Sequence, residues 1–236
     1  MPRVYLDAPF ALNEKVPLEE KHFHYLVHVM RVQKGEKVLA FNGRQGLWEG
    51  VLTFEGKKQA SLQMISLLEE QPRQEGQDAW LLFAPIKKEP MDWMIQKATE
   101  LGVSKMIPVL TERTNASRLN LDRFRLIATE ASEQSERLTI PEITPAIGLE
   151  DLLKKWDESR TLCYLNERGK KHFLPPIEKK AAFFIGPEGG FAPRELKWLS
   201  AFDFAVPLNL GERILRAETA ALSVLSIWNF YHLSAD

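Results

Sequence analysis

The stretch AAFFIGPEGGF (residues 181–191) joins an apolar run to a glycine-rich turn, and a helical pattern begins after it at Pro193. An apolar strand that leads into glycines and then into a helix is typical of α/β folds. Glycines let a ligand approach the backbone closely, and ligands of open α/β sheets bind at the carboxyl ends of the strands. The stretch therefore predicts an α/β domain with a binding loop at residues 185–191, although a tight turn that needs glycine only for its conformation is the alternative.

A second stretch, VPLNLGERILRAETAA (residues 206–221), repeats the order of strand, glycine and helix. We expect the helix to run over residues 212–233, which places Arg213, Arg216 and Glu218 around its first turns. The helix dipole favours anions at a helix start, so two arginines are unfavourable there unless they meet a carboxylate or a phosphate. This pattern indicates a functional role for both arginines.

The surrounding chain alternates apolar strands with amphipathic helices, as in an α/β layer fold. We expect strands at residues 80–85, 105–110, 161–165, 181–185 and 204–208, and helices at 91–101, 121–137, 149–156, 193–201 and 212–233. The last helix carries apolar residues on nearly all sides, so we expect it to be buried on most of them. A terminal helix is hard to bury on most sides within one subunit, so this pattern predicts a homodimer interface. Deep packing of the helix inside one subunit is the alternative.

The N-terminal part has a different pattern. Short strands are expected at residues 37–41, 47–54 and 60–67, with a tight turn at Asn42 and Gly43 and one short helix at 19–30. The charged segment 69–77 lacks apolar residues and is expected to be a linker. We therefore predict two domains, a small β-barrel at residues 1–72 and the α/β domain at 73–236.

The composition of the 236 residues, with 44% hydrophobic and 27% charged, is that of a folded globular protein. The sequence has no long apolar run and no signal-peptide pattern at its start, so a cytoplasmic location is expected. Cys163 is the only cysteine, which excludes an intrachain disulfide and favours a buried apolar role for it. His22, His24 and His28 have spacings that spread them around a helix, so no metal site is expected.

The formal net charge of −1 leaves no excess of positive charge for binding RNA through bulk electrostatics. Positive charge can only be local. Arginines cluster between residues 113 and 137, but acidic residues alternate with them, so a solvated helix face of mixed charge is an equal alternative.

The two glycine-containing stretches, read together as IGPEGGF (185–191) and LNLGERILRAETA (208–220), resemble the SPOUT (knotted α/β) RNA methyltransferases. They are most similar to the RsmE family, which methylates N3 of a uridine in the 16S ribosomal RNA. Upstream motifs agree with that family, namely HVMRVQKGE (28–36), IQKATELGV (95–103), TER (111–113) and EASEQSER (130–137). The similarity spans nearly the whole chain. Asn42 stands where the family has Asp, and Glu136 where Gly or Thr is common; neither lies in the glycine loops.

The resemblance implies S-adenosylmethionine as the methyl donor, a homodimer, a deep trefoil knot in the α/β domain and a PUA-like RNA-binding barrel at residues 1–72. It implies 16S ribosomal RNA or the assembled small subunit as the partner, with no membrane and no metal. The cofactor contacts that it implies are Leu165, Gly186, Pro187, Glu188, Gly190, Leu208, Leu210, Gly211, Ile214, Leu215 and Ala217.

The same resemblance suggests roles in catalysis and RNA binding. Arg213 or Arg216 would stabilise a uracil oxyanion, and Glu188 or Glu218 would accept the N3 proton, with a structural ion pair as the alternative role of Glu218. RNA contacts are expected from Arg3, Arg31, Arg113 and Arg137, and Glu130 and Gln134 are expected to face the active cleft or the partner subunit. Two other functions stay open: a non-catalytic ribosome-assembly factor that binds RNA, and an enzyme that holds a phosphate ligand on the GPEGG loop.

Overall fold

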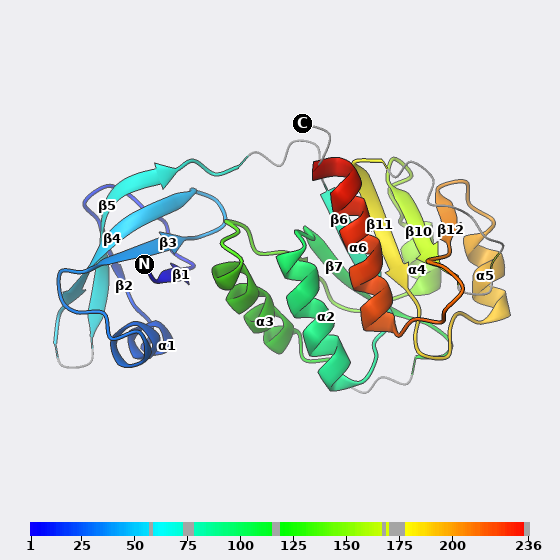
Figure 1. The fold of residues 1–236 in the computed structure, drawn as a ribbon, viewed down its shortest axis with the longest axis horizontal. Helices are drawn as coiled ribbons and strands as arrows, with labels where there is room; N and C mark the ends of the chain where they lie inside the picture. The colour runs from blue at the N-terminus through cyan, green and yellow to red at the C-terminus, as the bar shows by residue number, and fades with distance from the viewer. Residues whose placement is uncertain (57–58, 73–77, 115–118, 167–168, 170–177, 234–236) are drawn as a thin grey trace. The chain divides into compact units, whose positions relative to one another are not determined.

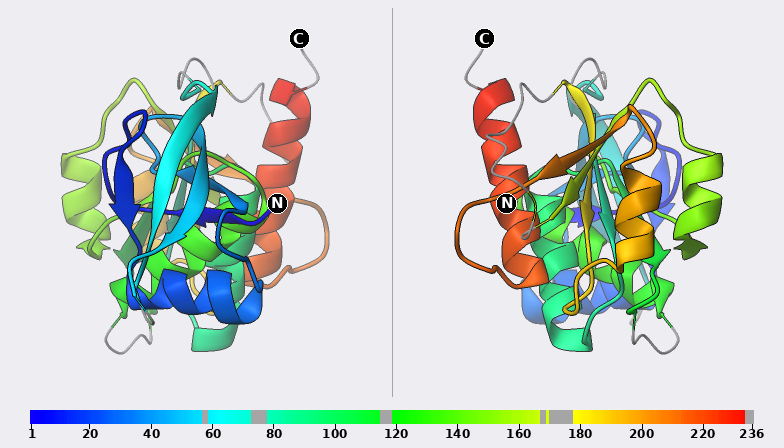
Figure 2. Two further views of the ribbon diagram at one scale, coloured as in Figure 1. Left: turned by 90° about the vertical axis from the view of Figure 1, so that its left-hand side faces the viewer. Right: turned by 90° about the vertical axis from the view of Figure 1, so that its right-hand side faces the viewer.

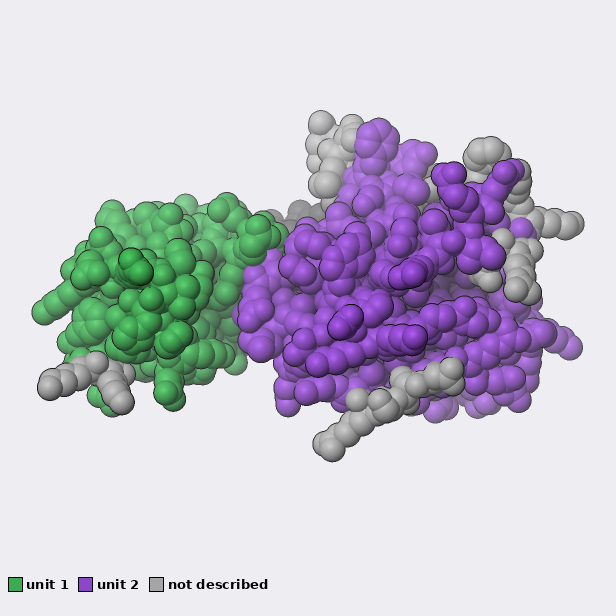
Figure 3. Space-filling view, turned by 60° about the horizontal axis from the view of Figure 1, so that its bottom comes forward, with its two compact units in different colours: residues 1–73, 132–140 green, residues 74–131, 141–236 purple. Residues whose placement is uncertain are grey.

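The chain divides into two compact units, residues 1–73 with 132–140 and residues 74–131 with 141–236, which Figure 3 colours separately. The computed structural model describes residues 1–56, 59–72, 78–114, 119–166, 169 and 178–233. The first unit takes in residues 132–140, a segment far along the chain from the expected boundary at 72/73. Residues 73–77 of the expected linker lie outside the described part.

The first unit contains a five-stranded sheet in the order β1-β3-β4-β5-β2 (Figure 1). Its strands are β1 Arg3–Tyr5, β2 Lys15–Pro17, β3 Lys37–Phe41, β4 Leu47–Phe54 and β5 Ala60–Glu69. Strands β3, β4 and β5 form an antiparallel meander, and β1 pairs with β3 in parallel. The three strands of the meander lie where the alternating pattern predicts them, whereas β1 and β2 are too short to show a period.

A short helix precedes the meander, as the sequence predicts. It consists of α1 Glu20–Phe23 and a π-helical turn, η1 His24–Val29. At the expected turn, the Oδ1 atom of Asn42 accepts hydrogen bonds from the backbone N–H groups of Arg44 and Gln45. Gly43 there has a φ of 78°, which only glycine adopts without strain.

The second unit is an α/β layer built on a sheet in the order β12-β10-β11-β6-β7-β8, with β9 paired to the end of β7. Its strands are β6 Asp78–Phe83, β7 Lys105–Leu110, β8 Glu142–Ile143, β9 Ile147–Gly148, β10 Thr161–Leu165, β11 Lys180–Ile185 and β12 Ala205–Leu208. All of these strands pair with their neighbours in parallel over the described residues. All these strands therefore end at the same edge of the sheet, which is where the glycine loops lie.

Helices cover both faces of this sheet, as the two views of Figure 2 show. The helices of the unit are α2 Lys88–Glu100, α3 Leu121–Gln134, α4 Leu149–Lys154, α5 Pro193–Leu199 and α6 Ala217–Leu233. Leu82 and Phe184 pack in one core cluster with apolar residues of α4 and α5. The side chains of alternate residues point to the other face, where Phe183 contacts Trp228 of α6 and Phe83 contacts Phe124 of α3. Because both faces of the sheet are buried, its strands consist of nearly continuous runs of apolar residues.

The start of the last helix differs from the prediction. Helix α6 begins at Ala217, not at residue 212, and residues 212–216 are not helical. Gly211 has a φ of 120°, which lies outside the helical region, and the side chains of Glu212, Arg213 and Ile214 are exposed. Helix α3 likewise ends at Gln134, three residues early, because Glu136 has a φ of 63°.

The burial of α6 is also narrower than predicted. Ala221, Val224, Leu225 and Trp228 are buried, but Phe230 is 69% and Tyr231 60% exposed. Within one chain the helix therefore buries one face only. None of the helices in the described ranges has the length and apolar character needed to cross a lipid bilayer.

Candidate functional site

Three neighbouring strands of the second unit bring the predicted cofactor residues to one edge. Strands β12, β10 and β11 are adjacent and parallel, and they end at Leu208, Leu165 and Ile185. Leu165 pairs directly with Leu208, and the N–H of Asn166 donates to the carbonyl of Leu208 at 2.8 Å. The loops that follow these strands therefore start side by side, which is the position of ligand sites in parallel α/β sheets.

The loop after β11 is a tight turn. The N–H of Gly190 donates to the carbonyl of Pro187 at 2.8 Å, and Gly190 has a φ of 67°. A Cβ atom on Gly186 would lie 3.2 Å from the ring of Phe191, which packs against Phe184 at 4.8 Å between ring centroids. Glycine is therefore favoured at Gly186 by the lack of space and at Gly190 by the conformation.

The loop after β12 presents the two arginines. The N–H of Gly211 donates to Oδ1 of Asn209 at 2.9 Å, which starts the turn away from the strand. Arg213, Ile214 and Arg216 are exposed, whereas the other residues predicted here are half-buried: Leu210, Leu215, Ala217 and Glu218.

The position of the arginines corrects the dipole argument. The carbonyl of Arg216 accepts the N–H of Ala220 at 2.8 Å, so Arg216 is the residue that caps α6. Arg213 lies three residues before it, outside the helix. The unfavourable helix dipole therefore acts on Arg216 and not on Arg213, because the effect falls off beyond the terminal turn.

Arg113 reaches the same edge from the loop after β7. Its Nη1 atom donates to the carbonyl of Gly189 at 2.7 Å, and its side chain is exposed. Glu188, beside this contact, is exposed as well. The structure thus brings Arg113 and the GPEGG loop together, as expected for residues that share a site.

Glu195 is a residue that the sequence reasoning missed. It is only 2% exposed, and its two carboxylate oxygens accept the backbone N–H groups of Ala192, at 2.8 Å, and of Glu112, at 2.7 Å. Its place three residues after Ala192, which precedes α5, is that of the glutamate in a capping box, but Ala192 lacks the hydroxyl that makes this motif recognisable in a sequence.

The other predicted RNA contacts lie in the first unit. Arg3 donates to the carbonyl of Glu136 and lies 3.5 Å from its carboxylate, with a side chain only 12% exposed. Burial lowers the pKa of Arg137 to about 10, and its guanidinium donates to Oγ1 of Thr139. Arg31 is exposed, with a φ of 57°. Two of these arginines are thus engaged within the unit, and their role toward RNA stays a prediction.

The part of this edge that the structure describes offers neither a metal-binding group nor a reactive thiol. No group of three or more His, Cys, Asp or Glu side chains in the described ranges has the geometry to hold a metal ion. Cys163 is 1% exposed, and burial raises the pKa of its thiol to about 12. A thiol of this kind is protonated and inert. The described residues present backbone groups, arginines and carboxylates at this edge.

Comparison with known proteins agrees with this site. Residues 73–229 match the model of the RNA methyltransferase domain, and residues 18–65 match that of the RNA methyltransferase PUA domain. The chain is 33% identical to ribosomal RNA small subunit methyltransferase E of Rickettsia conorii, over 95% of this chain and 93% of that protein. It is 32% identical to the Synechocystis protein of the same name, over 91% of this chain and 73% of that protein.

Solved structures give the same result. The ribosomal RNA small subunit methyltransferase E of Neisseria gonorrhoeae, solved bound to S-adenosyl methionine, superposes with a TM-score of 0.85 at 30% identity, over 98% of this chain and 97% of that one. A methyltransferase from Legionella pneumophila in complex with the same cofactor gives 0.83 at 29% identity, over 97% and 96%. With one domain model covering more than half of the chain and full-length relatives above 30% identity, the chain belongs to the ribosomal RNA small subunit methyltransferase E family.

Proposed function

We propose that the chain transfers the methyl group of S-adenosylmethionine to N3 of a uridine in 16S ribosomal RNA. The observation that carries the proposal is that β10, β11 and β12 end side by side at one sheet edge, with Gly186 and Gly190 after β11 and Gly211 after β12. Family membership and the cofactor-bound Neisseria relative support the same donor.

The residues at this edge fit S-adenosylmethionine. Glycines, which lack side chains, let an adenine and a methionine moiety approach the backbone closely, while half-buried Leu165, Leu210 and Leu215 provide apolar contacts. The remaining contacts that we propose are Pro187, Glu188, Leu208, Ile214 and Ala217. When bound, S-adenosylmethionine supplies an electrophilic methyl group on its sulfonium.

The chain's own contribution to the reaction is position and charge. Uridine N3 carries a proton at neutral pH, so a base must remove it while the uracil oxygens gain negative charge. Arg213 and Arg216 are exposed, and either guanidinium can stabilise that charge. Glu188 in the GPEGG loop and Glu218 in the first turn of α6 are the two candidate bases. Holding N3 in line with the methyl group is the larger part of the catalysis.

RNA would be held by both units. Arg113 is the contact that we propose beside the cofactor, and Arg31, Arg3 and Arg137 are those of the first unit. The five-stranded sheet of that unit would curl into a PUA-like barrel, and a folded RNA would be recognised by its shape and a flipped base, since the net charge is −1. Binding of this kind should depend only weakly on salt concentration.

We further propose that the last part of the second unit is knotted and that two chains form a dimer. The chain leaves the edge strand β12, yet α6 packs on β11, two strands further in, and on α2. A knot is one path for this return. Exposed Phe230 and Tyr231 on α6 support an interface with a second copy.

Deletion and complementation test the function. Nucleoside mass spectrometry of ribosomal RNA from cells without this protein should show loss of 3-methyluridine, restored by the wild type and not by Arg216→Ala. Persistence of 3-methyluridine in the deletion strain would refute the substrate. If Arg216→Ala restores it fully while Arg213→Ala does not, the charge-stabilising role belongs to Arg213.

A further inference from the structure

Glu195 joins two loops that come from strands which are not neighbours. The GPEGG loop and α5 follow β11, and residues 111–114 follow β7, while β6 lies between those strands in the sheet. One carboxylate oxygen accepts the N–H of Ala192 at 2.8 Å, and the other accepts the N–H of Glu112 at 2.7 Å. The carboxylate therefore spans the end of β6 and ties the two loops together.

Two further contacts connect the same pair of loops. Arg113 donates to the carbonyl of Gly189 at 2.7 Å, and Arg194 lies 3.0 Å from the carboxylate of Glu112. Both are at the surface, where ion pairs and hydrogen bonds compete with water and contribute little. We name the set of Glu112, Arg113, Gly189, Arg194 and Glu195 the clasp.

The geometry of the clasp depends mainly on Glu195. It is 2% exposed, so its two hydrogen bonds have almost no competition from water, and each joins a charged acceptor to a backbone N–H. A backbone N–H that loses its acceptor away from water is left unsatisfied, which is unfavourable. The hydrogen bonds of the buried Glu195 carboxylate therefore hold the backbone of both loops, and the surface contacts of Arg113 and Arg194 form on this backbone.

The loops that Glu195 holds are those to which the proposed function assigns the cofactor and the RNA. The GPEGG loop carries Gly186 and Gly190, and the β7 loop carries Arg113, whose guanidinium already touches Gly189. We infer that Glu195 is a positioning residue, which holds the S-adenosylmethionine loop and the Arg113 loop in fixed relation. This inference rests on the proposed function and adds the residue that aligns its two binding loops.

The substitution Glu195→Gln removes one of the two hydrogen bonds to the backbone with little change in side-chain volume. Glutamine has a single carbonyl oxygen, so one backbone N–H keeps its acceptor and the other meets the amide NH₂, which is a donor. A loss of about 1.4 kcal/mol in cofactor binding corresponds to a tenfold rise in Kd. We therefore expect the Kd for S-adenosylmethionine, measured by calorimetry, to rise about tenfold.

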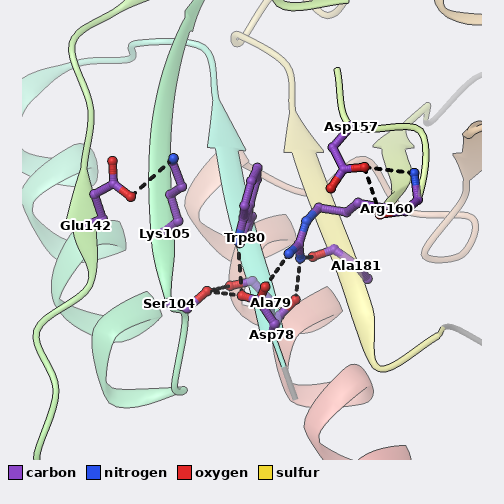
Figure 4. A network of polar contacts seen from close by, with 10 residues as sticks. Asp78, Ala79, Trp80, Ser104, Lys105, Glu142, Asp157, Arg160 and Ala181 are labelled. Carbon is purple, nitrogen blue, oxygen red and sulfur yellow. Dashed lines mark hydrogen bonds and ion pairs between the residues drawn. The ribbon is translucent and has the colours of Figure 1, made fainter. Parts of the chain in front are cut away.

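Asp78→Asn is the matched control for a merely structural effect. Asp78 is also a partly buried carboxylate held by hydrogen bonds, but it lies at the start of β6, at the amino end of the strands (Figure 4). This variant should lower the Tm and leave the Kd for S-adenosylmethionine unchanged. Both variants are measured at a temperature well below their Tm, with circular dichroism as a check of the fold.

Amide hydrogen exchange provides a readout that does not need the cofactor. Glu195→Gln should speed exchange at the N–H of Glu112 or Ala192, and Asp78→Asn should not. A Kd within twofold of the wild type in Glu195→Gln would overturn the inference and leave the proposed function standing. Failure of the wild type to bind S-adenosylmethionine would overturn both.

Discussion

The guanidinium of Arg160 stacks on the indole of Trp80, with its central carbon 3.9 Å from the ring centroid. On the same ring, Nζ of Lys105 lies 4.8 Å from the centroid (Figure 4). The Arg160 side chain is 5% exposed and also pairs with the carboxylate of Asp78, which in turn accepts from Ser104 and from Trp80 Nε1. These residues close the amino end of the sheet, opposite to the edge at which we propose that the cofactor binds.

Removing the charge of Asp78 should weaken the fold. Asp78→Asn leaves the buried guanidinium of Arg160 without its counter-charge, and because the carboxylate is 29% exposed the loss of this charged hydrogen bond costs about 2 kcal/mol. We expect the free energy of unfolding in urea at pH 7 to fall by about that amount. Glu150→Gln, in an exposed pair with Lys154 on α4, is the control and should change it by less than about 0.5 kcal/mol. Equal stability of the two variants would contradict the prediction.

The effect of Asp78 should also depend on pH. Burial alone would raise its pKa, but hydrogen bonds from Ser104, Arg160 and Trp80 outweigh burial and hold the pKa below the usual 3.8. A carboxyl whose pKa is lower in the folded state stabilises the fold fully above its unfolded pKa, and this contribution is lost as the pH falls through the folded pKa. The difference between wild type and Asp78→Asn should therefore be constant from pH 5 to 7 and shrink below about pH 4. Urea unfolding at a series of pH values measures it.

Cys163 should report on unfolding. Cys163 lies on β10 and is 1% exposed, so a reagent cannot reach its thiol in the folded protein. Burial also raises the pKa of the thiol to about 12, so the reactive thiolate does not form at neutral pH. We expect no reaction with a thiol reagent in the native protein and complete reaction in urea. The control is a surface cysteine, Ser226→Cys on α6, which should react at once. Rapid labelling of native Cys163 would show that the strand opens locally.

Gly186→Ala should impair cofactor binding. Its Cβ would lie 3.2 Å from the Phe191 ring, which is 7% exposed and packed against Phe184, so the ring has little room to move. The loop would have to shift, and we expect the Kd for S-adenosylmethionine to rise at least tenfold, about 1.4 kcal/mol. Gly148→Ala, where a Cβ meets no atom within 4 Å, is the control for the loss of a glycine. Normal binding by Gly186→Ala would exclude close contact between this loop and the cofactor.

Much of this architecture is predictable because its patterns are local. Strands β3, β4, β7 and β10 begin and end where alternation or apolar runs place them, since a buried strand needs apolar residues at defined spacing. The two glycine loops were predicted for a similar reason, because glycine after a strand has a conformational cause that is visible in the sequence.

Features set by distant partners were not predictable. Residues 212–216 have good helical propensity, yet Gly211 before them has a φ of 120°, and α6 starts only at Ala217. The grouping of residues 132–140 with the first unit depends on contacts such as that of the Tyr5 N–H with Glu133, which join residues far apart in the chain. Glu195 was missed for the same reason, since its second acceptor oxygen serves Glu112, which is distant in sequence.

The exposed end of α6 makes the dimer testable. Phe230 and Tyr231 are 69% and 60% exposed, and their rings contact each other at 6.0 Å between centroids. Burying two aromatic side chains against a second copy would contribute about 3 kcal/mol or more. We therefore expect the wild type to sediment as a dimer at micromolar concentration, and Phe230→Asp with Tyr231→Asp to sediment as a monomer.

Leu12→Asp, at a 60% exposed leucine of the first unit, is the control and should stay dimeric. A monomeric wild type, or a double variant that remains dimeric, would refute this interface. The near-ultraviolet and far-ultraviolet circular dichroism of the variant should match the wild type, because neither side chain is buried within one chain.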